Sequence, residues 1–157
     1  MRLAALILIS AFSLQANVFL HQVREAYFKA ASNKDESVRL NRLLDTVGEN
    51  SSPVMLCYKG AAKMLKARYS VNPLTKMSFF NKGKDLIEHS ISRDTACVES
   101  RFIRFTIQRN LPGFLGYGKN IKQDSSMIAG RLQELTDNDL KSRIDNYFKQ
   151  LKAALKH

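Results

Sequence analysis

The residues best suited to chemistry form a polar stripe on one short helical stretch. Arg101, Arg104 and Gln108 recur at intervals of three and four residues, so they fall on the same side of a helix. Phe102 and Phe105 lie on a flanking side, and a helix with apolar flanks is typically packed between neighbours. Two guanidinium groups one turn apart can hold a carboxylate or a phosphate in a bidentate manner. The stripe is therefore our candidate ligand-binding site.

A second interpretation of the same stripe is structural. Buried arginines need a compensating anion, and an internal salt bridge to Glu99, Asp85 or Asp124 would supply one. The ligand interpretation instead requires an open groove. Basic and aromatic residues suited to line such a groove are Lys82, Lys84, Phe114 and Tyr117. Tyr117, in the glycine-rich loop that follows Pro112, completes the candidate ligand-binding set. Both interpretations fit the sequence.

The two cysteines, Cys57 and Cys97, fall at the starts of the third and fifth predicted helices. In stacked helical pairs these would be neighbouring first helices, and an oxidising compartment would permit a disulfide between them. The alternative is a pair of buried thiols, because cysteine packs well as a small hydrophobic residue. Both outcomes stay open at this point.

Other chemistry has little support in the sequence. It contains no G-x-S-x-G, H-E-x-x-H or Walker motif, and its three histidines are scattered. Glu88 and His89 are adjacent, so they point about 100° apart on a helix and do not chelate together. We therefore predict a non-enzymatic protein with no metal and no cofactor. The alternative function is a small envelope hydrolase or lyase that uses an arginine and acid site.

The elements that must position these residues are helical almost throughout. Apolar spacing and caps predict an all-α fold of about seven helices, and no stretch alternates as a strand would. The predicted helices cover residues 18–31, 36–47, 53–69, 76–92, 96–111, 121–135 and 139–155. Short corners pair them into antiparallel hairpins, which we expect to stack as a tetratricopeptide-like superhelix. Generic antiparallel packing of helices is the competing arrangement.

The first residues predict export. Arg2 precedes an apolar run from Leu3 to Ile9, and a small residue at Ala16 offers a cleavage site, which together are typical of a secretory signal. Ala11-Phe12-Ser13 is the other candidate for cleavage. A buried first helix is the alternative. We expect a signal peptide at 1–16 and a single helical domain at 17–157, without a transmembrane segment in the mature chain. The destination would be the periplasm or the exterior.

The charge of the chain bears on its partners. Its formal net charge is +11, which favours anionic partners. Export argues against nucleic acid, so the expected partner is a protein, a peptide or an anionic component of the cell envelope.

Several short motifs between Tyr58 and Tyr117 resemble one protein family. The matching pieces are Tyr58-Lys59-Gly60-Ala61-Ala62, Asn72-Pro73, Phe80-Asn81-Lys82-Gly83-Lys84, Arg101-Phe102-Ile103-Arg104-Phe105 and Asn110-Leu111-Pro112-Gly113-Phe114-Leu115-Gly116-Tyr117. Together they resemble a family of small, uncharacterised exported proteins of Gram-negative bacteria. The resemblance implies an exported helical fold. It implies no activity and transfers no functional residue.

Overall fold

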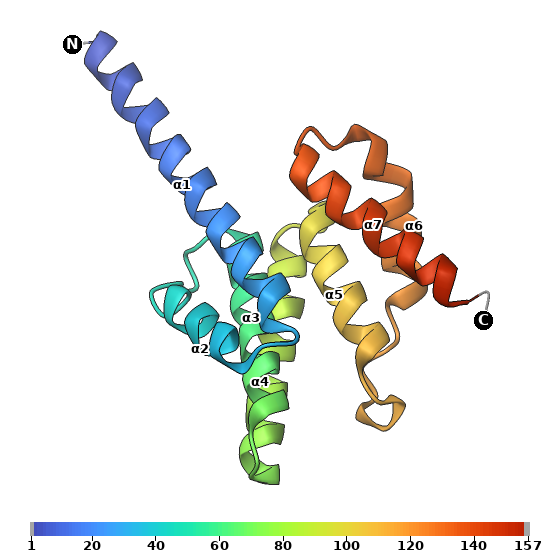
Figure 1. The fold of residues 1–157 in the computed structure, drawn as a ribbon. Coiled ribbons are helices and arrows are strands. Elements are labelled where there is room, and N and C mark those ends of the chain that lie inside the picture. Colours follow the sequence, from blue (N-terminus) through green and yellow to red (C-terminus); the bar gives the residue numbers. More distant parts are fainter. Residues whose placement is uncertain (1, 156–157) are drawn as a thin grey trace. The chain divides into compact units, whose positions relative to one another are not determined.

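The computed structural model describes the backbone of residues 2–155 and the side chains from residue 15 onward. Over this range the chain forms seven α-helices, two short 3-10 helices and no strand (Figure 1). The helices belong to two compact units, Met1–Arg93 and Asp94–His157. The predicted all-α class and the predicted number of helices are thus confirmed. The tetratricopeptide-like stacking of the hairpins stays a prediction.

The first unit begins with α1 (Arg2–Ala30), which packs against α2 (Lys34–Leu43) and α3 (Pro53–Tyr69). Val23, Ala26 and Ala30 are buried on one side of α1, as expected from their spacing. The helix starts well before the predicted residue 18. The predicted signal segment, 1–16, begins outside the described residues, so its boundary stays a prediction. Within the described part of the chain, no helix is both long enough and apolar enough to span a membrane.

Two asparagines begin helices earlier than predicted. The side-chain oxygen of Asn33 accepts hydrogen bonds from two backbone N–H groups of the first turn of α2, at 2.9 and 3.2 Å. Asn72 does the same for α4 (Pro73–Arg93), at 2.9 and 3.1 Å. Such caps satisfy N–H groups that a helix start otherwise leaves without partners. The two helices therefore begin at Lys34 and Pro73 rather than at residues 36 and 76.

The α3–α4 hairpin is the most closely packed part of the first unit. A Cβ atom on Gly60 would lie 2.6 Å from the carbonyl oxygen of Gly83, and one on Gly83 would lie 2.7 Å from that of Gly60. Only glycine at both positions allows the two backbones to approach this closely. Near the other end of the hairpin, the Ser90 hydroxyl donates to the carbonyl of Pro53 at 2.6 Å. The two helices are thus joined along their length.

The second unit contains α5 (Val98–Asn110), α6 (Ile121–Arg131) and α7 (Asn138–Ala154). The 3-10 helix Gly113–Leu115 lies between α5 and α6, and Leu132–Glu134 follows α6. Pro112 comes just after the end of α5, as predicted. The predicted helix 121–135 leaves the α-helical conformation at Arg131 and finishes as a 3-10 turn, which is common at helix ends.

Aromatic packing joins α5 to α7 and forms the core of the second unit. The ring centroid of Tyr147 lies 5.4 Å from that of Phe102 and 6.1 Å from that of Phe105. The Phe148 ring stacks on Phe105 at 5.4 Å. These contacts bury the flank of α5 that carries Phe102 and Phe105, and Ile103 on the other flank is buried as well. The polar stripe between the two flanks therefore needs hydrogen-bond partners.

Candidate functional site

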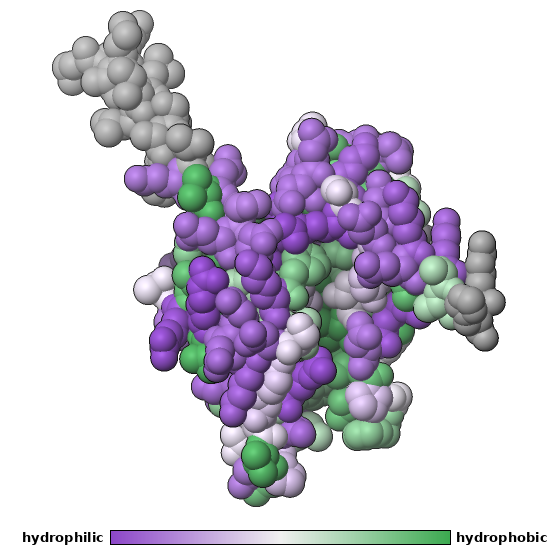
Figure 2. Space-filling model, in the orientation of Figure 1, coloured by the Kyte–Doolittle hydropathy of each residue, from purple (hydrophilic) through white to green (hydrophobic). Residues whose placement is uncertain are grey.

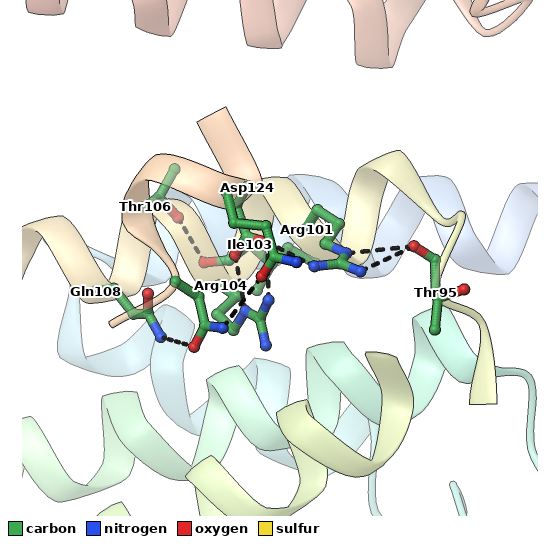
Figure 3. Close-up of polar contacts among 9 residues, drawn as sticks. Thr95, Arg101, Ile103, Arg104, Thr106, Gln108 and Asp124 are labelled. Carbon is green, nitrogen blue, oxygen red and sulfur yellow. Dashed lines mark hydrogen bonds and ion pairs between the residues drawn. The ribbon is translucent and has the colours of Figure 1, made fainter. Parts of the chain in front are cut away.

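Arg101 and Arg104 share one internal carboxylate, that of Asp124 on α6 (Figure 3). Arg104 binds it in a bidentate manner, with Nε donating to Oδ2 at 2.7 Å and Nη2 donating to Oδ1 at 2.8 Å. Nη1 of Arg101 donates to Oδ1 at 2.9 Å. The Asp124 side chain is 0% exposed. This ion cluster holds α5 and α6 together with strong, charge-assisted hydrogen bonds.

The remaining nitrogens of Arg101 also have an internal acceptor. Nε and Nη2 donate to the carbonyl oxygen of Thr95, at 3.3 and 3.1 Å (Figure 3). Thr95 lies in the corner that precedes α5. Each of the three guanidinium nitrogens of Arg101 is therefore engaged within the second unit, and the side chain links this corner to α6.

Gln108, the third member of the stripe, is buried but bonds to a different residue. Its Nε2 donates to Oδ1 of Asn120, which precedes α6, at 3.4 Å. Its Oε1 is the one buried side-chain oxygen or nitrogen without a hydrogen-bond partner among the described residues. The structure thus places Gln108 beside the same α5–α6 contact, in a weaker arrangement than the two arginines.

The two aromatic residues expected to line the same groove, Phe114 and Tyr117, differ in their exposure to solvent. Tyr117 is buried in the loop before α6, whereas the Phe114 side chain is 86% exposed. Gly116, between them, has a φ of 62°, a left-handed conformation that favours glycine and turns the chain. Lys82 and Lys84 lie on α4 of the first unit. A shared groove lined by all four residues stays a prediction.

The structure identifies Asp124 as the internal carboxylate that pairs with the two arginines. Of the three acids considered for the stripe, Asp124 contacts both arginines, and its carboxylate already forms the bidentate bond that a ligand carboxylate would form. The structural interpretation therefore has a specific anion. Binding of an external ligand by Arg101, Arg104, Gln108 and Tyr117 stays a prediction.

The largest concentration of positive charge lies in the first unit, on the α3–α4 hairpin. Residues 50–84 contain seven lysines and arginines and not one aspartate or glutamate. The seven are Lys59, Lys63, Lys66, Arg68, Lys76, Lys82 and Lys84. No catalytic or metal-binding motif marks this run, so a search for such motifs misses it. A running count of charges along the sequence reveals it.

Lys63 shows the effect of this concentration on a single side chain. Lys59, Lys63 and Lys66 recur at helical spacing along one side of α3. Burial lowers the pKa of Lys63, and the positive charges of Lys66 and Lys59 lower it further. Lys82 on α4 acts in the same direction, whereas Asp45 opposes it. The ammonium group is therefore destabilised where it lies.

Asp45 offsets the lysine charges at Lys63 only in part, and ion pairs among the described side chains do not neutralise this surface. Among the side chains of residues 15–155, no ion pair involves the lysines of the hairpin. Lys59 instead donates to the carbonyl oxygen of Val47, and the ammonium of Lys66 lies 4.7 Å from the centre of the Phe79 ring. We call the side chains of Lys59, Lys63, Lys66 and Lys82 the lysine face.

The two cysteines lie in different units. Cys57 is buried in α3, and Cys97 is half-buried at the N-cap of α5, where its sulfur accepts from the backbone N–H of Ser100 at 3.5 Å. Both side chains are thiols in this structure. A disulfide between them stays a prediction, since it would have to bridge the two units. In the described part of the chain, no group of three or more His, Cys, Asp or Glu residues is arranged to hold a metal ion.

Comparison with protein-family models, with curated proteins and with solved structures found no match to this chain. The family resemblance inferred from the sequence motifs therefore stays a prediction. The candidate sites rest on the geometry and charge of the chain itself: a buried ion cluster in the second unit and an unneutralised lysine face in the first.

Proposed function

We propose that this protein is a non-enzymatic binding scaffold of the exported compartment whose ligand is anionic and binds at the lysine face. The single observation that carries the proposal is the charge of residues 50–84, which hold seven basic residues and no acidic one. Like charges gathered in a run without acidic residues repel one another, and a bound anion would relieve this repulsion.

The state of Lys63 supports this choice of face. Its lowered pKa reports that the ammonium form is disfavoured by burial and by neighbouring lysines. A phosphate, sulfate or carboxylate group placed among Lys59, Lys63 and Lys66 would favour the charged form. The face is therefore electrostatically complementary to a ligand with several negative charges.

The second unit supports binding over catalysis. Asp124 and the two arginines are the prominent constellation of acid and base in this protein, and the Asp124 carboxylate is 0% exposed. A catalytic acid or base must come within hydrogen-bond reach of its substrate. Enclosed between two guanidinium groups, this carboxylate is better suited to holding α5 against α6.

Export of the protein is part of the proposal. Arg2, the apolar run after it and Ala16 favour export to the periplasm or the exterior. In such a compartment the expected ligand is an anionic component of the envelope or an acidic segment of a protein. The basic hairpin suits either, because its charge rather than a shaped pocket provides the attraction.

The proposal is tested by calorimetric titration of the full chain with soluble polyphosphate as the probe. The variant K63Q/K66Q/K82Q removes three charges from the lysine face, and K34Q/K149Q/K152Q removes three exposed charges elsewhere. We expect the intact chain to bind polyphosphate in a salt-sensitive manner and the first variant to bind about tenfold or more weakly. The control variant should change affinity by about twofold. Absence of binding at low salt, or equal loss in both variants, would contradict the proposal.

A further inference from the structure

The corner of the α3–α4 hairpin presents apolar side chains to solvent. Val71 is 96% exposed and Leu74 is 82% exposed, and Met77 is exposed as well. Leu74 and Met77 are three residues apart in α4, so they share a side of the helix, and Val71 directly precedes its cap. Green apolar surface is visible at the lower end of the view in Figure 2, where Figure 1 places the corner between α3 and α4. We call Val71, Leu74 and Met77 the apolar tip.

Exposure of this kind needs an explanation. Single apolar residues on a protein surface are ordinary, but several together usually mark a contact with a partner or a membrane. The apolar tip concentrates three of them within seven consecutive residues, all outside the core of the first unit. Its position at the corner of a hairpin makes it a projecting feature rather than a groove.

Basic residues surround the apolar tip. Lys76 lies between Leu74 and Met77 in the first turn of α4, and Lys66 lies close to the other end of the corner, over the Phe79 ring at 4.7 Å. The nearest acidic residues in the sequence are Glu49 and Asp85, both far from the corner along the helices. Apolar side chains flanked by lysines are the chemistry that enters the interface of a membrane with anionic headgroups.

We propose that the α3–α4 corner docks on an anionic lipid bilayer, with the apolar tip in the interfacial region and the lysines beside the headgroup phosphates. This rests on the proposed function, because it assigns the anionic ligand of the hairpin to a lipid surface. Charge complementarity together with the exposed apolar tip selects the bilayer: a soluble polyanion would be held by the lysines alone and would leave Val71 and Leu74 in water.

The packing of the hairpin suits this placement. The glycine contact between Gly60 and Gly83 lies nine residues from the end of α3, which corresponds to about 14 Å of helix. Interfacial segments enter the membrane to a depth of about 5–10 Å. The close contact of the two helices would thus stay outside the bilayer and hold the hairpin rigid while its corner is immersed.

The test is flotation of the full chain with vesicles of phosphatidylcholine alone or of phosphatidylcholine mixed with phosphatidylglycerol. V71S/L74S removes two residues of the apolar tip, and V38S/L155S removes an exposed valine and leucine elsewhere. We expect binding only to the anionic vesicles, weakened about tenfold by V71S/L74S and little changed by V38S/L155S. K63Q/K66Q/K82Q should weaken vesicle binding about a hundredfold. Thermal melts establish that each variant is folded.

Titration of V71S/L74S with polyphosphate separates the two proposals. Unchanged polyphosphate binding together with lost vesicle binding supports docking of the apolar tip on lipid. Polyphosphate binding by the intact chain without any vesicle binding overturns the lipid assignment and leaves the anion-binding function standing. Loss of both ligands by the intact chain overturns both. Vesicle binding that is lost in F114S but kept in V71S/L74S would also overturn the assignment, because Phe114 is an equally exposed residue of the other unit.

Discussion

Arg104 and Asp124 form a bidentate ion pair between α5 and α6, and Arg101 donates to the same carboxylate. Two positive charges thus share one buried carboxylate. Burial of charges is tolerated only when the pairing is complete, so the loss of the shared member leaves both guanidinium groups without their carboxylate. The cluster therefore makes the stability of the second unit depend on one aspartate.

Replacing that aspartate should be strongly destabilising. For D124A we expect the free energy of unfolding to fall by about 3–5 kcal/mol, since the variant strands two buried charges. The control is D139A, which removes an ion pair within α7 between Asp139 and Arg143 that is partly exposed. It should cost less than about 1 kcal/mol. Urea denaturation followed by circular dichroism measures both values. Similar losses in the two variants would refute the special role of Asp124.

The arginine stripe can be separated from a ligand site by an anion titration. We expect R101A to destabilise the protein by about 3 kcal/mol and phosphate to raise the melting temperature of the intact chain and of R101A equally. The physical reason is that Thr95 and Asp124 already occupy the donors of Arg101. Thermal melts with and without phosphate provide the comparison. Stabilisation by phosphate that disappears in R101A would instead assign the stripe to a ligand.

The close contact at Gly60 predicts that replacing this glycine by alanine has a different effect on stability from the same replacement at Gly130. In G60A, the added methyl group would lie 2.6 Å from a carbonyl oxygen of the backbone, and the helices would have to separate. We expect a loss of about 3 kcal/mol. The matched control is G130A in α6, where a Cβ atom meets nothing within 4 Å and alanine favours the helix by about 1 kcal/mol. Denaturant midpoints should therefore move in opposite directions. A stable G60A would show that the contact is less close than described.

Lys63 should make stability depend on pH in the alkaline range. Its pKa is lowered in the folded state, so between that value and the ordinary lysine pKa the unfolded chain binds more protons than the folded one. The contribution of Lys63 to stability must therefore rise as pH increases through this window. At neutral pH we expect K63Q to melt about 1–2 °C above the intact chain, with a difference that shrinks as pH rises. Melts across the alkaline range test this, and a difference independent of pH would contradict it.

Local features of the sequence predicted the helices well, and distant contacts were harder to predict. Leu140 and Ile144 are four residues apart within the predicted helix 139–155, so they share one side of it, and the structure buries both. Periodicity depends on neighbours within one helix, which the sequence shows directly. The predicted starts of α2 and α4 were too late in the sequence, because Asn33 and Asn72 cap these helices. Asparagine is also common in turns, so its presence alone does not distinguish a helix cap from a loop.

The site was predictable in part. Spacing showed that Arg101 and Arg104 share a stripe, but the choice among three acids depends on which helix packs against α5, and no local pattern contains that information. That Gly83 lies opposite Gly60 was not predictable from the sequence, because this pairing depends on how two helices pack together. The lysine face requires charges from two helices to be counted together, which a search for motifs along the chain does not do.

The most direct measurement of the central claim is the pKa of Lys63 itself, followed by NMR of its side chain with and without polyphosphate. In the ligand-free protein the pKa should lie below that of an ordinary lysine, because the ammonium group is partly buried among other lysines. If the lysine face binds anions, added polyphosphate should raise this pKa toward its ordinary value, and K66Q should raise it without any ligand. A pKa of Lys63 that does not change when polyphosphate is bound would place the ligand elsewhere and contradict the proposed function of the hairpin.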